Sequence, residues 1–197
     1  MSNHLKPDII VIGACAGGVE ALQQVVADLT PNLPAAFFVT NYLPSRNIRF
    51  LPEILSRSGP LPAGHPMNGS PIQTGNIYVA PPDHHLLVHQ DRIELNSGPK
   101  ENRHRPAINA LFRSAASAYG PRVIGVVLTG ALDDGTAGLW EIKQRGGKSI
   151  VQDPKDALFP DMPRHALEHV PIDHVTSLRG LAPLLTDIVS KPRRGSP

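Results

Sequence analysis

The chain has 197 residues, of which 41% are hydrophobic and 18% charged, a composition typical of a soluble globular domain. Its formal net charge of +2 is too small to indicate nucleic-acid binding, and no apolar run is long enough to cross a bilayer. We therefore expect no nucleic-acid partner and no direct membrane insertion. The single cysteine excludes an internal disulfide framework. The first residues lack the apolar core of a signal peptide, which favours a cytoplasmic location.

Strand and helix patterns alternate along most of the chain. Continuous apolar runs predict buried strands, and apolar residues at spacings of three and four predict helices. The expected elements are strand 8–12, helix 19–29, strand 35–40, helix 50–55, helix 108–119, strand 122–130, helix 136–145, strand 148–152, helix 162–170, strand 173–177 and helix 178–190. This order predicts a single α/β domain over residues 1–190, with a doubly wound, mainly parallel sheet, helices on both faces and a tail at 191–197.

One segment departs from this alternation. Residues from about 76 to 95 contain short strand patterns separated by Pro-Pro-Asp and Gln-Asp turns. These turns predict an antiparallel β-hairpin insert in the α/β domain. Three histidines of the segment, His84, His85 and His89, are expected to face solvent, as histidines in such strands usually do.

Polar or reactive residues follow three of the predicted strands. Cys15 follows the first strand, Asn41 and Tyr42 follow the second, and Asp133 and Asp134 follow the strand at 122–130. In open α/β sheets ligands bind beyond the carboxyl ends of the strands. The sequence therefore predicts a site where these three strand ends meet.

Cys15 has two interpretations. It precedes a helix start marked by Gly17 and Gly18, where backbone amides and the helix dipole favour a thiolate or a nearby oxyanion. A free cysteine is nevertheless more often a small, inert, buried residue. The segment "GACAGG" lacks the glycine spacing of a dinucleotide fingerprint, and no Gly-Lys-Ser/Thr phosphate loop is present, so we expect no nucleotide cofactor.

The other polar segments also leave alternatives open. One of Asp133 and Asp134 is expected to cap a turn or helix, and the other could orient a base. We expect no metal there, because no histidine or glutamate accompanies the pair at ligand spacing. The segment Arg103-His104-Arg105 fits either a solvated basic turn or a carboxylate-binding lip above the strand ends.

Six segments in order resemble the catalytic domain of chemotaxis-type protein-glutamate methylesterases, the CheB family. They are "IGACAGGVEAL", "PAAFFVTNYLP", "GNIYVAPPDHHLLV", "GPKENRHRPAINALFRSAA", "GVVLTGALDDGTAGL" and "ALFPDMPRHAL". The resemblance implies a doubly wound α/β domain with a hairpin insert. It also implies hydrolysis of glutamate methyl esters on chemoreceptors, deamidation of receptor glutamines, and a Ser-His-Asp triad. The implied partner is a chemoreceptor-like or other signalling protein that carries glutamate methyl esters.

Two of the three triad positions differ from the family pattern. Cys15 stands at the serine position, Tyr42 at the histidine position, and Asp134 at the aspartate position. The residues expected to bind substrate are Ala16, Gly17, Gly18, Arg103, His104, Arg105 and Leu132. A thiol remains a nucleophile, but a phenol does not replace a base that becomes a cation.

These replacements leave two hypotheses. In the first, hydrolysis is weakened or lost and a chemotaxis or signalling binding module remains. In the second, the chain is a working esterase or amidase with Cys15 as nucleophile, assisted by Tyr42 and Asp134, with His104 as a further candidate.

Overall fold

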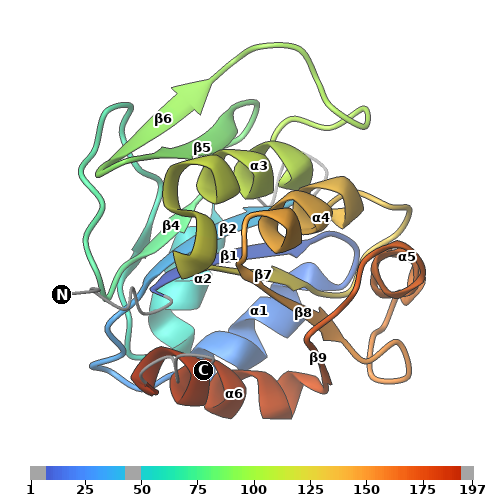
Figure 1. Ribbon diagram of the computed structural model, residues 1–197. Helices are drawn as coiled ribbons and strands as arrows, with labels where there is room; N and C mark the ends of the chain where they lie inside the picture. The colour runs from blue at the N-terminus through green and yellow to red at the C-terminus, as the bar shows by residue number, and fades with distance from the viewer. Residues whose placement is uncertain (1–7, 43–49, 192–197) are drawn as a thin grey trace, which may run out of the picture.

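The computed structural model describes residues 8–42 and 50–191, which build an α/β sandwich around one parallel sheet (Figure 1). The strand order is β3-β4-β2-β1-β7-β8-β9, and every neighbouring pair is parallel. The strands are β1 (Ile9–Ala14), β2 (Ala36–Asn41), β3 (Ala63–Gly64), β4 (Ile77–Val79), β7 (Val123–Val127), β8 (Lys148–Gln152) and β9 (His174–Thr176). The doubly wound, mainly parallel sheet predicted from the sequence is confirmed.

Helices cover both faces of this sheet, as predicted (Figure 1). One face carries α1 (Gly18–Ala27), α2 (Leu51–Ser58) and α6 (Leu178–Ser190), and the other carries α3 (Ile108–Tyr119), α4 (Thr136–Gln144) and α5 (Asp161–His169). The central strands β1, β2 and β7 are buried at every residue, which explains their continuous apolar runs. Two apolar clusters, one on each face, form the core.

The hairpin insert is shorter than the sequence predicts. It consists of β5 (His85–His89) and β6 (Arg92–Asn96), which pair antiparallel and pack on α3. The prediction that residues 76–95 are all antiparallel is wrong for β4, which pairs parallel with β2 and β3. Ile77 and Val79 are buried in the core, and the ring of Tyr78 stacks on Phe38 of β2. This alternating pattern fits parallel and antiparallel pairing equally well. Which of the two β4 forms therefore depends on a partner strand that is remote in sequence.

His85 is also placed differently from the expectation, because it is buried at 4% exposure. Its Nε2 lies 2.9 Å from the carbonyl oxygen of Pro99, and its Nδ1 lies 3.2 Å from the backbone nitrogen of Ala107. A ring with its hydrogen on Nε2 satisfies both contacts, donating to the carbonyl and accepting from the amide. His85 thus fastens the hairpin to the segment that enters α3.

Two expectations concern residues at the chain ends. The tail predicted at 191–197 lies outside the described residues except for Lys191, and so do residues 1–7, on which the expected location partly rests. Among the described residues, no helix has both the length and the apolar character needed to cross a membrane.

Packing of α4 on α3 depends on a glycine and yields a first prediction. A Cβ atom at Gly138 would lie 2.5 Å from Cβ of Phe112 and 3.2 Å from Cα of Asn109. Glycine to alanine normally favours a helix, but here it should lower the free energy of unfolding by about 1–3 kcal/mol because the contact is overpacked. Urea denaturation measures this free energy.

Gly64→Ala is the matched control, because a Cβ atom at Gly64 meets nothing within 4 Å. It should leave the free energy of unfolding within about 0.5 kcal/mol of the parent. A Gly138→Ala protein as stable as the parent would show that α3 and α4 can move apart without a loss in the free energy of unfolding.

Candidate functional site

Three neighbouring strands of the sheet deliver the predicted site residues to one edge. Cys15 follows β1, Tyr42 follows β2, and Asp134 lies in the loop after β7. The backbone N–H of Tyr42 donates to the carbonyl of Ala14 at 3.1 Å, and that of Cys15 donates to Thr129 at 3.0 Å. These bonds extend the strand pairing past the strand ends. The three segments therefore lie side by side at the carboxyl edge, where α/β sheets bind ligands.

Cys15 is half-buried beneath the segment that follows β7. A Cβ atom at Gly130 would lie 2.9 Å from Cβ of Cys15, so only glycine lets this segment pass so closely. The N–H of Gly130 donates to Phe159, and its carbonyl accepts from Met162, which fixes the segment before α5 beside the thiol. Cys15 packs on the apolar core at its inner side but keeps partial exposure, so it is not an enclosed core cysteine.

The turn after Cys15 presents two amides. Gly17 adopts a left-handed backbone (φ 72°) and caps α1, a conformation that favours glycine. The N–H of Gly18 donates to the carbonyl of Cys15 at 2.9 Å, so it is not directed at the thiol. Among the described residues, the N–H groups of Ala16 and Gly17 have no hydrogen-bond partner. They are the groups of this turn available to an oxygen bound beside Cys15.

Asp134 is a buried carboxylate held by backbone amides. It is 5% exposed and accepts from the N–H groups of Ile108 (2.8 Å), Asn109 (3.1 Å) and Gly135 (3.0 Å). The side-chain amide of Asn102 donates a fourth bond at 3.1 Å. Two of the amides belong to the first turn of α3, whose own N-cap residue supplies no side-chain cap. Asp134 therefore caps α3 from a remote loop and places a negative charge at the positive end of the helix.

No ionisable ring reaches this carboxylate among the described residues. Instead, Tyr42 lies against His104, with ring centroids 3.9 Å apart and planes at 54°. The Nδ1 atom of His104 is buried and has no hydrogen-bond partner within the described residues. Tyr42 and Asp134, which the family pattern pairs as base and orienting acid, are therefore connected only through the loop that carries His104 and Asn102.

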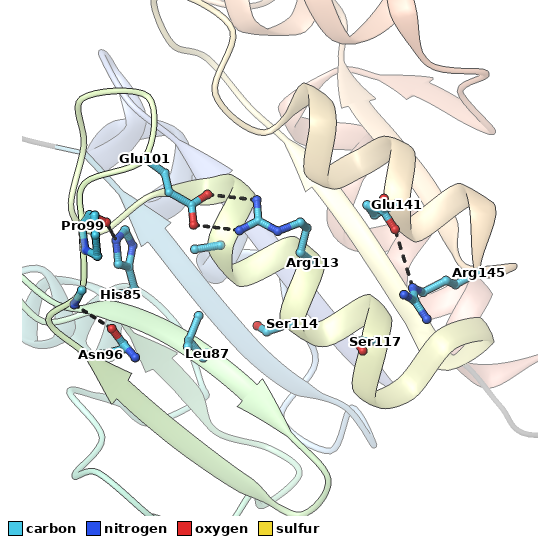
Figure 2. A pocket seen from close by; sticks show the side chains of 12 residues that line it. His85, Leu87, Asn96, Pro99, Glu101, Arg113, Ser114, Ser117, Glu141 and Arg145 are labelled. Atoms are coloured by element: carbon cyan, nitrogen blue, oxygen red, sulfur yellow. Dashed lines mark hydrogen bonds and ion pairs between the residues drawn. The ribbon is translucent and has the colours of Figure 1, made fainter.

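The loop at 101–104 is anchored by an ion pair. Glu101 and His104 exchange two backbone hydrogen bonds of 2.8 and 3.1 Å, and the Glu101 carboxylate takes two bonds from Arg113 of α3, at 2.9 and 2.7 Å (Figure 2). These side-chain bonds from Arg113 lower the pKa of Glu101 below its usual value, so the anchor stays charged through neutral pH. The cavity of about 540 Å³ drawn in Figure 2 includes this pair but none of Cys15, Tyr42 and Asp134.

Arg105, beside His104, already has partners within the chain. Arg105 donates to Asp83 at 2.6 and 2.9 Å and to the carbonyl oxygens of Ser97 and Gly98. Its guanidinium thus holds the hairpin against the 97–105 segment, and substrate binding by Arg103 and Arg105 stays a prediction. Arg103 is exposed, with a left-handed backbone (φ 68°).

Leu132 lies at the edge of the site, in the loop that carries Asp134. It is 59% exposed and also adopts a left-handed backbone (φ 68°). Substrate binding by Leu132, and by the residues after Cys15, stays a prediction.

Two asparagines organise the site without a sequence signal. Asn102 bonds Asp134, and the side-chain oxygen of Asn109 accepts from Gly135 (3.1 Å) and Gly138 (2.8 Å). Nothing in their spacing distinguishes them from ordinary loop and helix asparagines. Asn41 differs from these two, because the sequence already predicts it to follow a buried strand. Its side-chain nitrogen and oxygen are both buried and lack hydrogen-bond partners among the described residues.

Comparison with known proteins identifies the same architecture elsewhere. The family model for CheB methylesterase matches residues 10–185. A Leptospira interrogans protein named for protein-glutamate methylesterase and protein-glutamine glutaminase is 35% identical over 178 residues, covering 90% of this chain and 92% of that protein. The crystal structure of the Thermotoga maritima CheB methylesterase catalytic domain superimposes with a TM-score of 0.89 at 29% identity, covering 93% of this chain and all of that one.

Other relatives are longer. The chain spans about half of a protein-glutamate methylesterase/protein-glutamine glutaminase of Methanosarcina mazei, at 33% identity over 92% of this chain. It likewise spans 49% of one from Xanthomonas euvesicatoria, at 37% identity over 85% of this chain. These matches support the resemblance read from the six sequence segments.

The network around Asp134 yields a second prediction. Asp134→Asn keeps the size of the side chain but replaces one acceptor oxygen with a donor that faces backbone N–H groups. We expect a loss of about 2–3 kcal/mol in the free energy of unfolding, the range for buried hydrogen bonds to a charged group. Urea denaturation at neutral pH measures it.

Asp133→Asn serves as the control, because Asp133 is exposed and its side chain makes no described hydrogen bond. It should change the free energy of unfolding by less than about 0.5 kcal/mol. Equal effects of the two substitutions would contradict a capping role for Asp134.

Proposed function

Because the chain belongs to the CheB methylesterase family, we propose that it binds a chemoreceptor-type signalling protein that carries glutamate methyl esters, with its hydrolase activity weakened by the residues at two triad positions. We place this role in the cytoplasm, where the signalling domains of chemoreceptors lie. The scaffold of the site is retained, and the change lies in the side chains of Cys15 and Tyr42.

The contact of Tyr42 with His104 is the observation that carries this proposal. A hydrolase of this type needs a group that removes the proton from the nucleophile and returns it to the leaving group. Tyr42 stands at that position, but a phenol does not become a cation at neutral pH, and its ring packs on His104. The oxygens of Asp134 accept hydrogen bonds from amides, so the aspartate stabilises the fold even without a catalytic base to orient.

A second candidate function is an active thiol esterase or amidase. The unpartnered, buried Nδ1 of His104 favours it, because this imidazole lies on the ring at the base position. In this mechanism the Cys15 thiolate adds to the ester or amide carbonyl, and methanol or ammonia leaves with the proton. Water then hydrolyses the thioester and releases the carboxylate and the thiol. The amides of Ala16 and Gly17 are placed to receive the oxyanion.

Hydrolysis rates of four proteins separate the two functions. We expect the parent and Cys15→Ser to hydrolyse an activated ester such as p-nitrophenyl acetate only slowly, since a hydroxyl needs a base more than a thiol does. Tyr42→His should raise kcat/KM, with a rate that increases between about pH 6 and 7 as an imidazole loses its proton. The double variant should exceed the parent by about 10²-fold or more, because triad members act as a unit.

Two controls fix the interpretation. Alkylation of Cys15, the single cysteine of the chain, should abolish whatever activity the parent shows, and His104→Ala should lower it only if the thiol esterase is real. A parent as fast as the double variant, and sensitive to both changes, would favour the second function over the first. A double variant as slow as the parent would contradict the proposal that only two side chains limit hydrolysis.

A further inference from the structure

A cluster of metal-ligating side chains lies on α5, outside the predicted site. His165, Glu168 and His169 each offer one ligand atom, and these atoms lie within 4.8 Å of one another. Positions three and four residues apart are neighbours on a helix surface, which explains why the sequence His-Ala-Leu-Glu-His brings them together. This cluster is separate from the Asp133–Asp134 pair, for which the sequence predicts no metal.

One of the two histidines has its tautomer set by a backbone contact. Nδ1 of His169 lies 2.9 Å from the carbonyl oxygen of His165, so it carries the hydrogen and donates it. This bond leaves the lone pair on Nε2, the arrangement in which a second hydrogen bond fixes the tautomer of a metal-binding histidine. The two rings are nearly parallel, with planes at 13° and centroids 5.9 Å apart.

The cluster adjoins a cavity of about 680 Å³ between α4, α5 and the loop before α3. His165 and His169 line it, together with Trp140 of α4. Asn102 and Asn109, two of the residues that hold Asp134, line the same cavity. A ligand at the two histidines would thus have room beside it, with polar groups on the facing wall.

We propose that His165, Glu168 and His169 bind a divalent transition-metal ion such as Zn²⁺. Two imidazoles and one carboxylate suit zinc, copper or nickel, whereas calcium and magnesium require oxygen ligands. In a tetrahedral zinc site with bonds of about 2.0–2.2 Å the ligand atoms lie about 3.4 Å apart, so the exposed side chains must move closer by up to about 1.4 Å. Three protein ligands leave a fourth position open to water or to a group in the cavity.

Fluorescence of Trp140 tests this site directly, because Trp140 is the single tryptophan of the chain and lines the same cavity. Paramagnetic Cu²⁺, added alone to the full chain, should quench this fluorescence with saturation at one ion per chain. Excess Zn²⁺, which does not quench, should compete and restore the signal; an excess is needed because Cu²⁺ binds such ligands more tightly. His165→Ala and His169→Ala should each raise the apparent dissociation constant at least about tenfold, and Glu168→Gln by less.

His174→Ala is the matched control, since His174 lies on β9 outside the cluster, and it should leave quenching unchanged. Far-UV circular dichroism verifies that each variant is folded; the three cluster residues are exposed, so no loss of structure is expected. Absence of saturable quenching in the parent would overturn the proposal. So would quenching that persists in His165→Ala and His169→Ala, since another metal site would then be responsible. Because the readout is metal binding, the result is independent of whether the chain hydrolyses esters.

Discussion

The carboxylate of Asp134 is the interaction on which the site depends. It is buried at the N-terminus of α3 and receives three backbone N–H groups and one side-chain amide. A buried charge is stable only when it is paired or fully hydrogen-bonded, and here the partners come from three separate segments. The β7–α4 loop, the 101–104 loop and α3 are therefore fixed relative to one another by one side chain. Because α3 also supports the hairpin, the position of the hairpin follows from the same contact.

This arrangement separates the framework of the site from its chemistry. The framework consists of backbone contacts: glycine at 130 above the thiol, the left-handed turn at Gly17, and the amides around Asp134. None of these needs a particular nucleophile or base. Different side chains at positions 15 and 42 can thus be accommodated without disturbing the fold, which agrees with the TM-score of 0.89 to a methylesterase catalytic domain.

The surroundings of Tyr42 link two of the predicted site residues through one loop. The ring contacts His104, and His104 belongs to the loop that Glu101 and Arg113 anchor to α3. The same loop reaches Asp134 through Asn102. Any movement of His104 toward the thiol would therefore strain contacts that hold the aspartate. This coupling joins Tyr42, the 101–104 loop and the cap of α3 into one unit.

The sequence by itself determined the layered architecture. Each central strand is buried on both faces and must be continuously apolar, and each helix must repeat its apolar residues at spacings of three and four residues. It also determined that Cys15, Tyr42 and Asp134 reach one edge, since parallel strands end on the same side. The tertiary structure alone decided the parallel pairing of β4, the burial of His85, the use of Arg105 on Asp83, and the capping of α3 by Asp134. Each of these joins segments at least 14 residues apart, and no local pattern encodes which remote group a strand edge, an imidazole or a charge will meet.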